Sequence, residues 1–278
     1  MIDYHVHTHH SIDAEGTIDE YCSQAVKRGL AEICFTNHCE LDPMRDDSYI
    51  RFDHRKILFS RDGVRRLQQE VFGARDRFRK HGLQVKFGLE VGFYRGIESV
   101  LQNMIDGLEL DFLIGSIHCL NHVCIDSSRE AHLYFSEHDA DHLMNEYYTE
   151  ITALIKSGLF DTIAHLDVYK KYGIQFYGGR IHAAPAELLR EIFSLMKETE
   201  TALEINTAGL RKINQLYPSK DIMTIARDQG MKLFTIGSDS HTVADLGKGI
   251  SEGIAYAMAY GFDMLCSYSG RKRLINSL

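Results

Sequence analysis

Several features are missing from this sequence of 278 residues, and each absence narrows the class of protein. No run of apolar residues approaches the roughly 18 that a membrane-spanning helix needs, and the first residues form a charged segment without the apolar core of a signal peptide. The six cysteines form no Cys-x-x-Cys motif and show no disulfide-dense spacing. We therefore expect a soluble, cytoplasmic protein with reduced, buried thiols.

Basic residues are fewer than acidic ones. The chain has 31 Lys and Arg against 39 Asp and Glu, which gives a formal net charge of −8. This balance argues against a general surface for long nucleic acids or anionic membranes. No internal repeat, low-complexity tract or Pro/Gly-rich linker divides the chain, and 44% of its residues are hydrophobic. The length suits one large α/β domain or two small ones, and we expect a single domain over residues 1–278.

Strand-like and helix-like segments alternate along the chain. The predicted strands cover residues 2–6, 31–36, 85–89, 110–117, 160–164, 203–205 and 231–236. The predicted helices cover residues 17–29, 61–81, 97–106, 141–157, 185–199, 219–229 and 249–260. Such alternation predicts parallel βα units with right-handed crossovers. Polar residues at nearly every strand end favour a closed barrel over a doubly wound open sheet.

Good metal ligands stand at the ends of these strands. His5 and His7 alternate with apolar residues in the first strand, so their imidazoles lie on one face. A rigid pair of neutral imidazoles suits a transition metal. The other strand ends carry His38, Glu90, His118, His165, Asp239 and His241, and Asp13 lies on the loop after the first strand. Because the carboxyl ends of barrel strands share one face, these nine residues predict one site, enough for two or three ions with a bridging carboxylate.

These motifs resemble those of the polymerase and histidinol phosphatase (PHP) superfamily of metal-dependent phosphoesterases. The resemblance covers the whole chain and rests on His5-Val-His7, Asn37-His38, Gly88-Leu-Glu90, Gly115-Ser-Ile-His118, Ala164-His165 and Asp239-Ser-His241, in the family's order. It implies a distorted seven-stranded βα barrel that holds a trinuclear cluster of zinc, iron or manganese.

The resemblance also implies how the ligands are shared. One ion is expected at His5, His7, Glu90 and Asp239, a second at Glu90, His118 and His165, and a third at Asp13, His38 and His241. The position of Asp13 is often histidine in the superfamily, so this chain departs there toward a harder oxygen ligand.

Size and flanking residues look most like the histidinol-phosphate phosphatase branch. The segment Glu204-Ile-Asn-Thr-Ala-Gly-Leu-Arg211-Lys212 is similar to that branch, and Arg211 is a candidate for binding phosphate through its planar charged fork. Arg180 and Lys170 are further candidates, although a solvated basic turn explains Lys170 equally well. Glu40, in the acidic loop after His38, is a candidate for the cationic end of the substrate, with an ordinary solvated loop as the alternative.

The activity that the resemblance implies is hydrolysis of L-histidinol phosphate to L-histidinol and phosphate, a step of histidine biosynthesis. The nucleophile would be a metal-bridging hydroxide. The candidate catalytic residues are Glu90, as the bridging carboxylate, and Asp239 and His241; the proton donor to the leaving group stays open between Asp239, His241 and a water. Asp3, Thr8 and Ser11 are expected to orient the ligands.

Three alternatives stay open from the sequence. An amidohydrolase-type barrel also begins with His-x-His, but that type typically ends on a lone Asp, whereas this chain ends on Asp239-x-His241 and carries Glu90 at its third strand. A PHP enzyme that acts on nucleotide phosphates or phosphodiesters would use the same ligands. A non-catalytic PHP module should have lost ligands, and all nine positions here carry competent ones. The expected partner is a small phosphorylated metabolite, and the oligomeric state is not specified.

Overall fold

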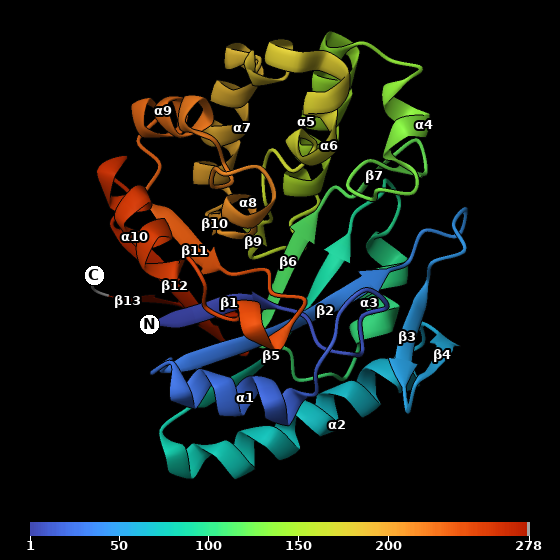
Figure 1. Cartoon of the computed structure of the whole chain (residues 1–278), viewed down its shortest axis with the longest axis vertical. Coiled ribbons are helices and arrows are strands. Elements are labelled where there is room, and N and C mark those ends of the chain that lie inside the picture. Colours follow the sequence, from blue (N-terminus) through green and yellow to red (C-terminus); the bar gives the residue numbers. More distant parts are fainter. Residues whose placement is uncertain (277–278) are drawn as a thin grey trace.

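The protein has a mixed α/β fold around one large sheet, as the computed structural model, which describes residues 1–276, shows (Figure 1). In spatial order the strands of this sheet are β1 (Ile2–Val6), β2 (Glu32–Glu40), β5 (Gln84–Gly92), β6 (Phe112–Ser116), β9 (Thr162–Ile163), β10 (Ala202–Asn206), β11 (Leu233–Gly237), β12 (Met264–Ser269) and β13 (Lys272–Asn276). Neighbouring strands are parallel from β1 to β12, and β13 pairs with β12 in the antiparallel sense.

Strand β11 lies beside β1 as well as beside β10 and β12. A parallel bridge joins Val6 to Ser240, and the His7 N–H donates to the Ser240 carbonyl at 3.0 Å. The carboxylate of Asp3 accepts hydrogen bonds from the backbone N–H groups of Ser238 at 2.9 Å and Gly247 at 3.0 Å. These contacts place the first strand beside the segment that follows β11, in the interior of the protein.

Helices connect the strands and cover the sheet. In the view of Figure 1, α1 and α2 lie on one side of the strands, and α5, α7 and α9 lie on the opposite side. The bounds of the longer helices are α1 (Ile18–Lys27), α2 (Arg61–Phe78), α3 (Glu98–Ile105), α5 (Ala140–Lys156), α7 (Ala186–Glu198), α9 (Lys220–Asp228) and α10 (Ile250–Ala259). No helix within residues 1–276 is long and apolar enough to cross a membrane.

The first helix illustrates how local sequence places these elements. Thr17 caps α1 through the predicted capping box: its hydroxyl accepts from the Glu20 N–H at 3.2 Å, and the Glu20 carboxylate accepts from the Thr17 N–H at 2.7 Å. The buried side chains of α1 are those of Ile18, Tyr21, Cys22 and Ala25, which follow the helical period and face the core.

All the predicted strands and helices are present, and the structure adds others. The additional elements are the hairpins β3 (Tyr49–Phe52) with β4 (Arg55–Leu58) and β7 (Cys119–Leu120) with β8 (Val123–Cys124), the helices α4 (Ala131–Phe135), α6 (Lys170–Tyr177) and α8 (Ala208–Lys212), three short 3₁₀ turns, and strands β12 and β13. The described sheet therefore has nine strands rather than the predicted seven. Both added hairpins turn through positive-φ residues, Asp53–His54 and Asn121–His122, which lack the usual turn glycine.

Candidate metal centre

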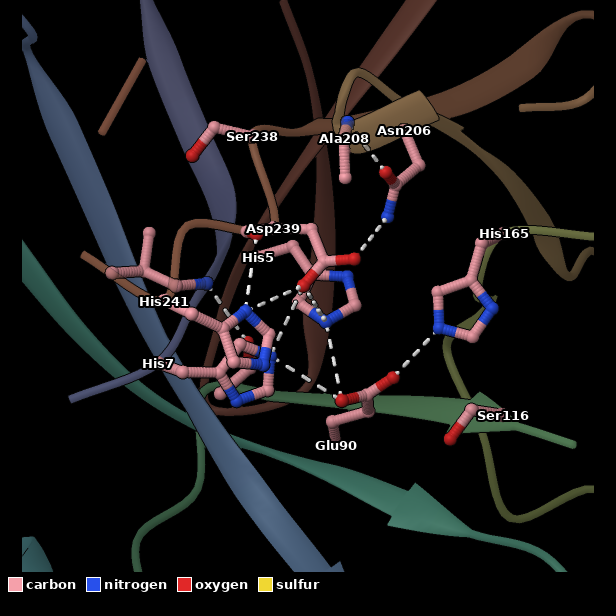
Figure 2. A network of polar contacts seen from close by, with 12 residues as sticks. His5, His7, Glu90, Ser116, His165, Asn206, Ala208, Ser238, Asp239 and His241 are labelled. Atoms are coloured by element: carbon pink, nitrogen blue, oxygen red, sulfur yellow. Dashed lines mark hydrogen bonds and ion pairs between the residues drawn. The ribbon is translucent and has the colours of Figure 1, made fainter. Parts of the chain in front are cut away.

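The nine predicted ligands converge at the carboxyl ends of the parallel strands. His5 lies in β1, His38 in β2 and Glu90 in β5. His118 follows β6, His165 follows β9, and Asp239 and His241 follow β11, while His7 and Asp13 come just after β1. Figure 2 shows His5, His7 and His241 gathered around Asp239 on one side of Glu90, with His165 on the other side.

Glu90 stands at the centre of this cluster. Its Oε1 lies 3.1 Å from Nε2 of His118 and 2.9 Å from Nε2 of His165. Its Oε2 faces three other rings, with His38 Nδ1 at 2.9 Å, His5 Nε2 at 3.3 Å and His7 Nε2 at 3.4 Å. Burial alone would raise the pKa of Glu90, but the imidazoles of His5, His118 and His38 hold it well below its usual range. A charged carboxylate therefore separates two sets of imidazole nitrogens.

Asp239 closes the cluster on the side of β11. Its Oδ1 lies 3.5 Å from Nε2 of His7 and 3.4 Å from Nδ1 of His241, and its Oδ2 accepts from the Asn206 side-chain amide at 3.2 Å. The backbone of Asp239 has φ +48°, in the left-handed region. This conformation costs about 1–3 kcal/mol in a non-glycine residue and persists where surrounding contacts determine it, typically at functional sites.

Asp13 lies close to the rings of His38 and His241, the two residues with which the resemblance grouped it. Its Oδ2 lies 3.6 Å from Nε2 of His38 and 3.4 Å from Nε2 of His241. The Asp13 side chain is 53% exposed, whereas that of Glu90 is 1% exposed. Asp13 and His241 therefore form the open edge of the cluster, where a substrate can enter.

The residues present fit bound metal ions. His5 and His7 are fully buried, yet within the part of the chain that the structure describes their Nε2 atoms have no hydrogen-bond partner. Such orphaned buried atoms are rare and need an explanation, which a bound cation supplies. Burial, together with the nearby rings of His38 and His241, lowers the pKa of His7 to about 3, so its imidazole is neutral and can donate a lone pair at neutral pH.

Compact groups of three potential ligand atoms occur throughout the cluster. Within each group the atoms lie within 4.8 Å of one another, and the groups are His7, His38 and His241; His5, His7 and Glu90; His5, His165 and Asp239; His38, Glu40 and His118; and Glu90, His118 and His165. Imidazole nitrogens mixed with carboxylate oxygens are typical of zinc, iron and manganese sites.

Further polar side chains orient the histidine rings. Glu204 Oε1 lies 2.6 Å from Nδ1 of His5, and Glu40 Oε1 lies 2.7 Å from Nδ1 of His118. Ser11 Oγ lies 3.3 Å from Nδ1 of His7, in agreement with its predicted orienting role. Each contact leaves the other ring nitrogen facing Glu90.

The orienting role of Glu204 was not predicted, although its place at the end of β10 matches that of the ligands. Glu40 was predicted to meet a cationic substrate group, but its carboxylate is occupied by His118 because β2 continues to Glu40 and turns it toward that ring.

A glycine allows β11 to approach β1 closely. A Cβ on Gly237 would collide with the Cβ of His5 and would lie 2.6 Å from Oε1 of Glu204. Any larger residue would therefore push apart the ligand His5 and the carboxylate that orients it.

Arg211 lies against the backbone of the cluster. Its Nη2 donates to the carbonyl of Ser238 at 2.7 Å and to that of Asp239 at 3.2 Å. Its Nη1 is buried and has no hydrogen-bond partner within residues 1–276. The side chain is 20% exposed, and its Nε lies 3.7 Å from Oδ2 of Asp245. The guanidinium thus carries an unused donor next to a candidate ligand.

The structure does not bring the other two predicted cations to the cluster. The Lys170 ammonium is fully buried and donates to Asp167 Oδ2 at 2.8 Å and to Ser219 Oγ at 2.5 Å, because the start of α6 points this side chain into the interior. Arg180 is 71% exposed and pairs with Asp141 of α5 at 2.8 Å on the surface.

The neighbouring Lys171 is the lysine that lies near the cluster. Its ammonium donates to the backbone carbonyl of Asp126 at 2.8 Å. Burial would lower the pKa of Lys171, but the carboxylates of Asp126 and, more weakly, Asp239 raise it. The sequence favoured Lys170 over this neighbour, and periodicity did not show that one residue further along the helix points toward the cluster.

Comparison with known proteins agrees with this geometry. The family model described as "PHP domain" matches residues 3–208, which include all the candidate ligands except Asp239 and His241. The chain is 31% identical over 248 residues to a probable histidinol-phosphatase of Deinococcus radiodurans, covering 89% of this chain and 88% of that protein. It is 29% identical to the histidinol-phosphatase of Lactococcus lactis subsp. lactis, covering 98% and 95% of the two chains.

A solved structure is similar over the same length. The crystal structure of histidinol phosphate phosphatase from Lactococcus lactis, complexed with zinc, L-histidinol and phosphate, superposes with a TM-score of 0.80 at 26% identity and covers 98% of each chain. The match of the family model to most of the chain, together with relatives that align over nearly the whole length, shows that the chain belongs to the PHP domain family.

Proposed function

We propose that the protein hydrolyses L-histidinol phosphate to L-histidinol and phosphate, a step of histidine biosynthesis. Its similarity to histidinol-phosphatases extends over nearly the whole chain. The structural observation that carries the proposal is Glu90, whose two oxygens face separate sets of imidazole nitrogens at 2.9–3.4 Å. A carboxylate in this position can bridge two metal ions, as phosphoesterases require.

The proposed cofactor is a set of three divalent ions, of zinc, iron or manganese. Glu90 would bridge a first ion, held also by His5, His7 and Asp239, and a second, held also by His118 and His165. Asp13, His38 and His241 would hold the third, and the distances from Asp13 to both rings support this grouping. The related Lactococcus lactis enzyme was crystallised with zinc.

Side chains of the protein would bind the phosphate and deliver the proton to the leaving group. When bound, divalent ions supply a hydroxide nucleophile at neutral pH and neutralise phosphate charge. The free Nη1 donor of Arg211 is suited to bind a phosphate oxygen, with Lys171 as a second cation nearby. The side chains of Asp239 and His241 are 16% and 31% exposed and reach the open side of the cluster, whereas Glu90 is closed to substrate. Burial alone would raise the pKa of Asp239, but the nearby ring of His5 holds it well below its usual range, so His241 or a water is better suited than Asp239 to deliver a proton to the leaving oxygen.

We also propose that the strands of this mixed α/β fold are arranged as a barrel. The seven parallel strands β1, β2, β5, β6, β9, β10 and β11 would form a distorted barrel, closed between β11 and β1, with β12 and β13 as an extension. The bridge from Val6 to Ser240 supports this closure. A single domain over residues 1–278 is consistent with one sheet that uses strands from both ends of the chain.

A substrate panel tests the function. Protein loaded with zinc, manganese or iron would be assayed against L-histidinol phosphate, an aryl phosphate, nucleoside monophosphates and a phosphodiester, with Glu90→Gln as the background control. We expect the highest kcat/KM for L-histidinol phosphate. A preference of about tenfold or more, equivalent to about 1.4 kcal/mol, for a nucleotide or a diester would reject the histidinol assignment but retain the phosphoesterase. No turnover of any ester with any metal would instead indicate a non-catalytic module.

A further inference from the structure

Two cysteines face each other on the hairpin that follows His118. Cys119 in β7 and Cys124 in β8 are direct partners in an antiparallel pair. The Ile125 N–H donates to the His118 carbonyl at 2.8 Å, so the next pair inward, Cys119 with Cys124, is a non-hydrogen-bonded pair. In such pairs the Cα atoms are about 4.5 Å apart and the side chains are close.

This geometry allows a disulfide without movement of the backbone. Disulfides join Cα atoms that are roughly 4.4–6.8 Å apart, and the pair falls at the short end of this range. The two thiols are already close enough to share a hydrogen bond, which together with burial raises the pKa of Cys124. Both cysteines are partly exposed, whereas Cys22, Cys34, Cys39 and Cys266 are buried.

The hairpin is held firmly in this register. Arg45 donates from Nη1 to the His122 carbonyl at 2.7 Å and to Glu130 Oε2 at 2.8 Å. The same Glu130 oxygen accepts from the Cys124 N–H at 3.1 Å. The ion pair therefore fixes both the turn and the second cysteine, which keeps the sulfurs opposed.

Cys119 and Cys124 are also connected to residues around the candidate metal centre. Cys119 follows the candidate ligand His118 directly in the chain. The Cys124 thiol donates to Asp126 Oδ1 at 2.9 Å, and the Asp126 backbone carbonyl accepts from Lys171 at 2.8 Å. The Asp126 carboxylate also faces that ammonium, with Oδ2 at 3.9 Å from Lys171 Nζ.

We propose that Cys119 and Cys124 form a reversible intramolecular disulfide that lowers the activity of the adjacent site. The Cys119 thiolate would attack a small-molecule disulfide and release one small thiol; the Cys124 thiol, losing its proton, would then displace the other small thiol from the mixed disulfide. Two protein thiols are oxidised and one small disulfide is reduced to two thiols. Disulfides of this kind in a reducing compartment are typically transient and redox-sensing.

Oxidation removes the hydrogen bond from the Cys124 thiol to Asp126. A disulfide sulfur carries no proton, so Asp126 Oδ1 loses the donor that it now has in Cys124. Its charge is then less compensated beside Lys171. Cys119 also follows the proposed ligand His118 directly, so the new bond constrains the segment that carries it, and disturbing the support of a metal ligand typically costs about 10–100-fold in metal affinity or activity. This effect on activity rests on the proposed function; the formation of the disulfide does not.

Mass spectrometry tests the disulfide directly. The metal-loaded protein would be incubated with oxidised glutathione until thiol loss stops, then unfolded in denaturant, alkylated and digested with trypsin. Cys119 and Cys124 share the arginine-bounded peptide 96–129, while Cys34 and Cys39, which are also five residues apart, share peptide 29–45 and provide a matched control. Cys34 and Cys39 lie on one extended strand, about 16 Å apart at about 3.3 Å per residue, and cannot be joined.

We expect peptide 96–129 to escape alkylation and to be lighter by two hydrogen atoms, while peptide 29–45 is fully alkylated. Turnover of L-histidinol phosphate and of an aryl phosphate should fall about tenfold on oxidation and return with a phosphine reductant. Cys119→Ser, which keeps the Cys124 thiol, should retain its turnover under the same treatment. Alkylation of both cysteines after oxidation would overturn the disulfide itself. A disulfide in peptide 96–129 with unchanged turnover would overturn the proposal that the disulfide controls activity. A reduced protein without any turnover would instead contradict the proposed phosphatase function and leave the disulfide to be judged by mass spectrometry alone.

Discussion

Glu204 Oε1 lies 2.6 Å from Nδ1 of His5, in the interior of the protein where both side chains are at most 1% exposed. The carboxylate can accept this contact only if Nδ1 carries the proton, which leaves the Nε2 lone pair facing Glu90. The second Glu204 oxygen accepts from the His165 N–H at 2.7 Å. One carboxylate thus orients the ring of His5 in β1, a proposed ligand, and holds the backbone of His165, the proposed ligand that follows β9.

Replacing Glu204 by Gln should therefore weaken metal binding without removing any ligand. An amide accepts less strongly than a carboxylate, and it can also present N–H groups to His5. We expect a loss of about 10–100-fold in metal affinity or in kcat/KM, as for other outer partners of metal-bound histidine. Metal titration and steady-state kinetics would measure it. Glu191→Gln, at an exposed position on α7, is the matched control and should change neither quantity; equal affinities for wild type and Glu204→Gln would remove Glu204 from the site.

Glu90→Gln should be the most damaging single change among the proposed ligands. Glu90 contacts both sets of imidazoles, whereas His165 contacts only the Oε1 side. We expect Glu90→Gln to lose about 10²-fold or more in kcat and more than one metal ion per chain, within the range for strongly coupled catalytic groups. His165→Asn should lose no more than one ion. Elemental analysis after purification without chelators would compare them, and a Glu90→Gln protein with normal metal content would show that Glu90 bridges nothing.

Arg211→Ala should weaken every phosphate ester to a similar extent. The substitution removes the unpaired Nη1 donor beside Asp239, and phosphate is the group that all these substrates share. We expect KM to rise for both L-histidinol phosphate and an aryl phosphate, with a smaller change in kcat. Arg190→Ala, which removes an exposed arginine paired with Glu187, should leave both KM values unchanged. A rise in KM for L-histidinol phosphate alone would place Arg211 at the alcohol end of the substrate.

The sequence predicted which side chains converge better than it predicted what surrounds them. The βα alternation fixes which residues stand at strand ends, so His38, Glu90 and His118 could be grouped without coordinates. Lys170 and Lys171 differ by one position on α6, and periodicity did not show which of them points inward. Glu40 was expected in a loop because β2 was predicted to end at residue 36, whereas pairing with β5 extends that strand to Glu40. The pairing of β2 with β5 joins residues that are far apart in the sequence, and local propensity contains no information about it.

Lys170 should matter for folding rather than for substrate. Its ammonium and the Asp167 carboxylate are both fully buried and lie 2.8 Å apart. Lys170→Met would leave Asp167 as an uncompensated buried charge, which typically costs about 3–5 kcal/mol in the free energy of unfolding. Denaturant unfolding would measure this loss. Lys232→Met, which breaks an exposed pair with Asp263, should cost at most about 1 kcal/mol. A Lys170→Met protein of normal stability but raised KM would restore Lys170 to the substrate site.

The stabilisation that zinc provides should increase with pH. Burial would lower the pKa of His118, but Glu90 and Glu40 raise it well above its usual value in the metal-free protein, and Asp13 and Glu90 do the same for His38. A histidine with a raised pKa in the folded state stabilises that state below its unfolded pKa of about 6.5, and this contribution is lost as the pH rises through the folded pKa.

The metal-free protein should therefore lose stability on going from about pH 6 to about pH 8, whereas zinc needs the deprotonated rings and binds more tightly as the pH rises. Thermal unfolding with and without saturating zinc would give the increase in Tm at each pH. His7, with a pKa of about 3, is neutral in the folded protein throughout this range and adds nothing to the pH dependence of zinc binding. Because its unfolded pKa is about 6.5, it stabilises the metal-free protein slightly as the pH rises and so opposes part of the loss from His38 and His118. An increase in Tm that is independent of pH, or larger at pH 6, would show that zinc does not displace protons from His38 and His118.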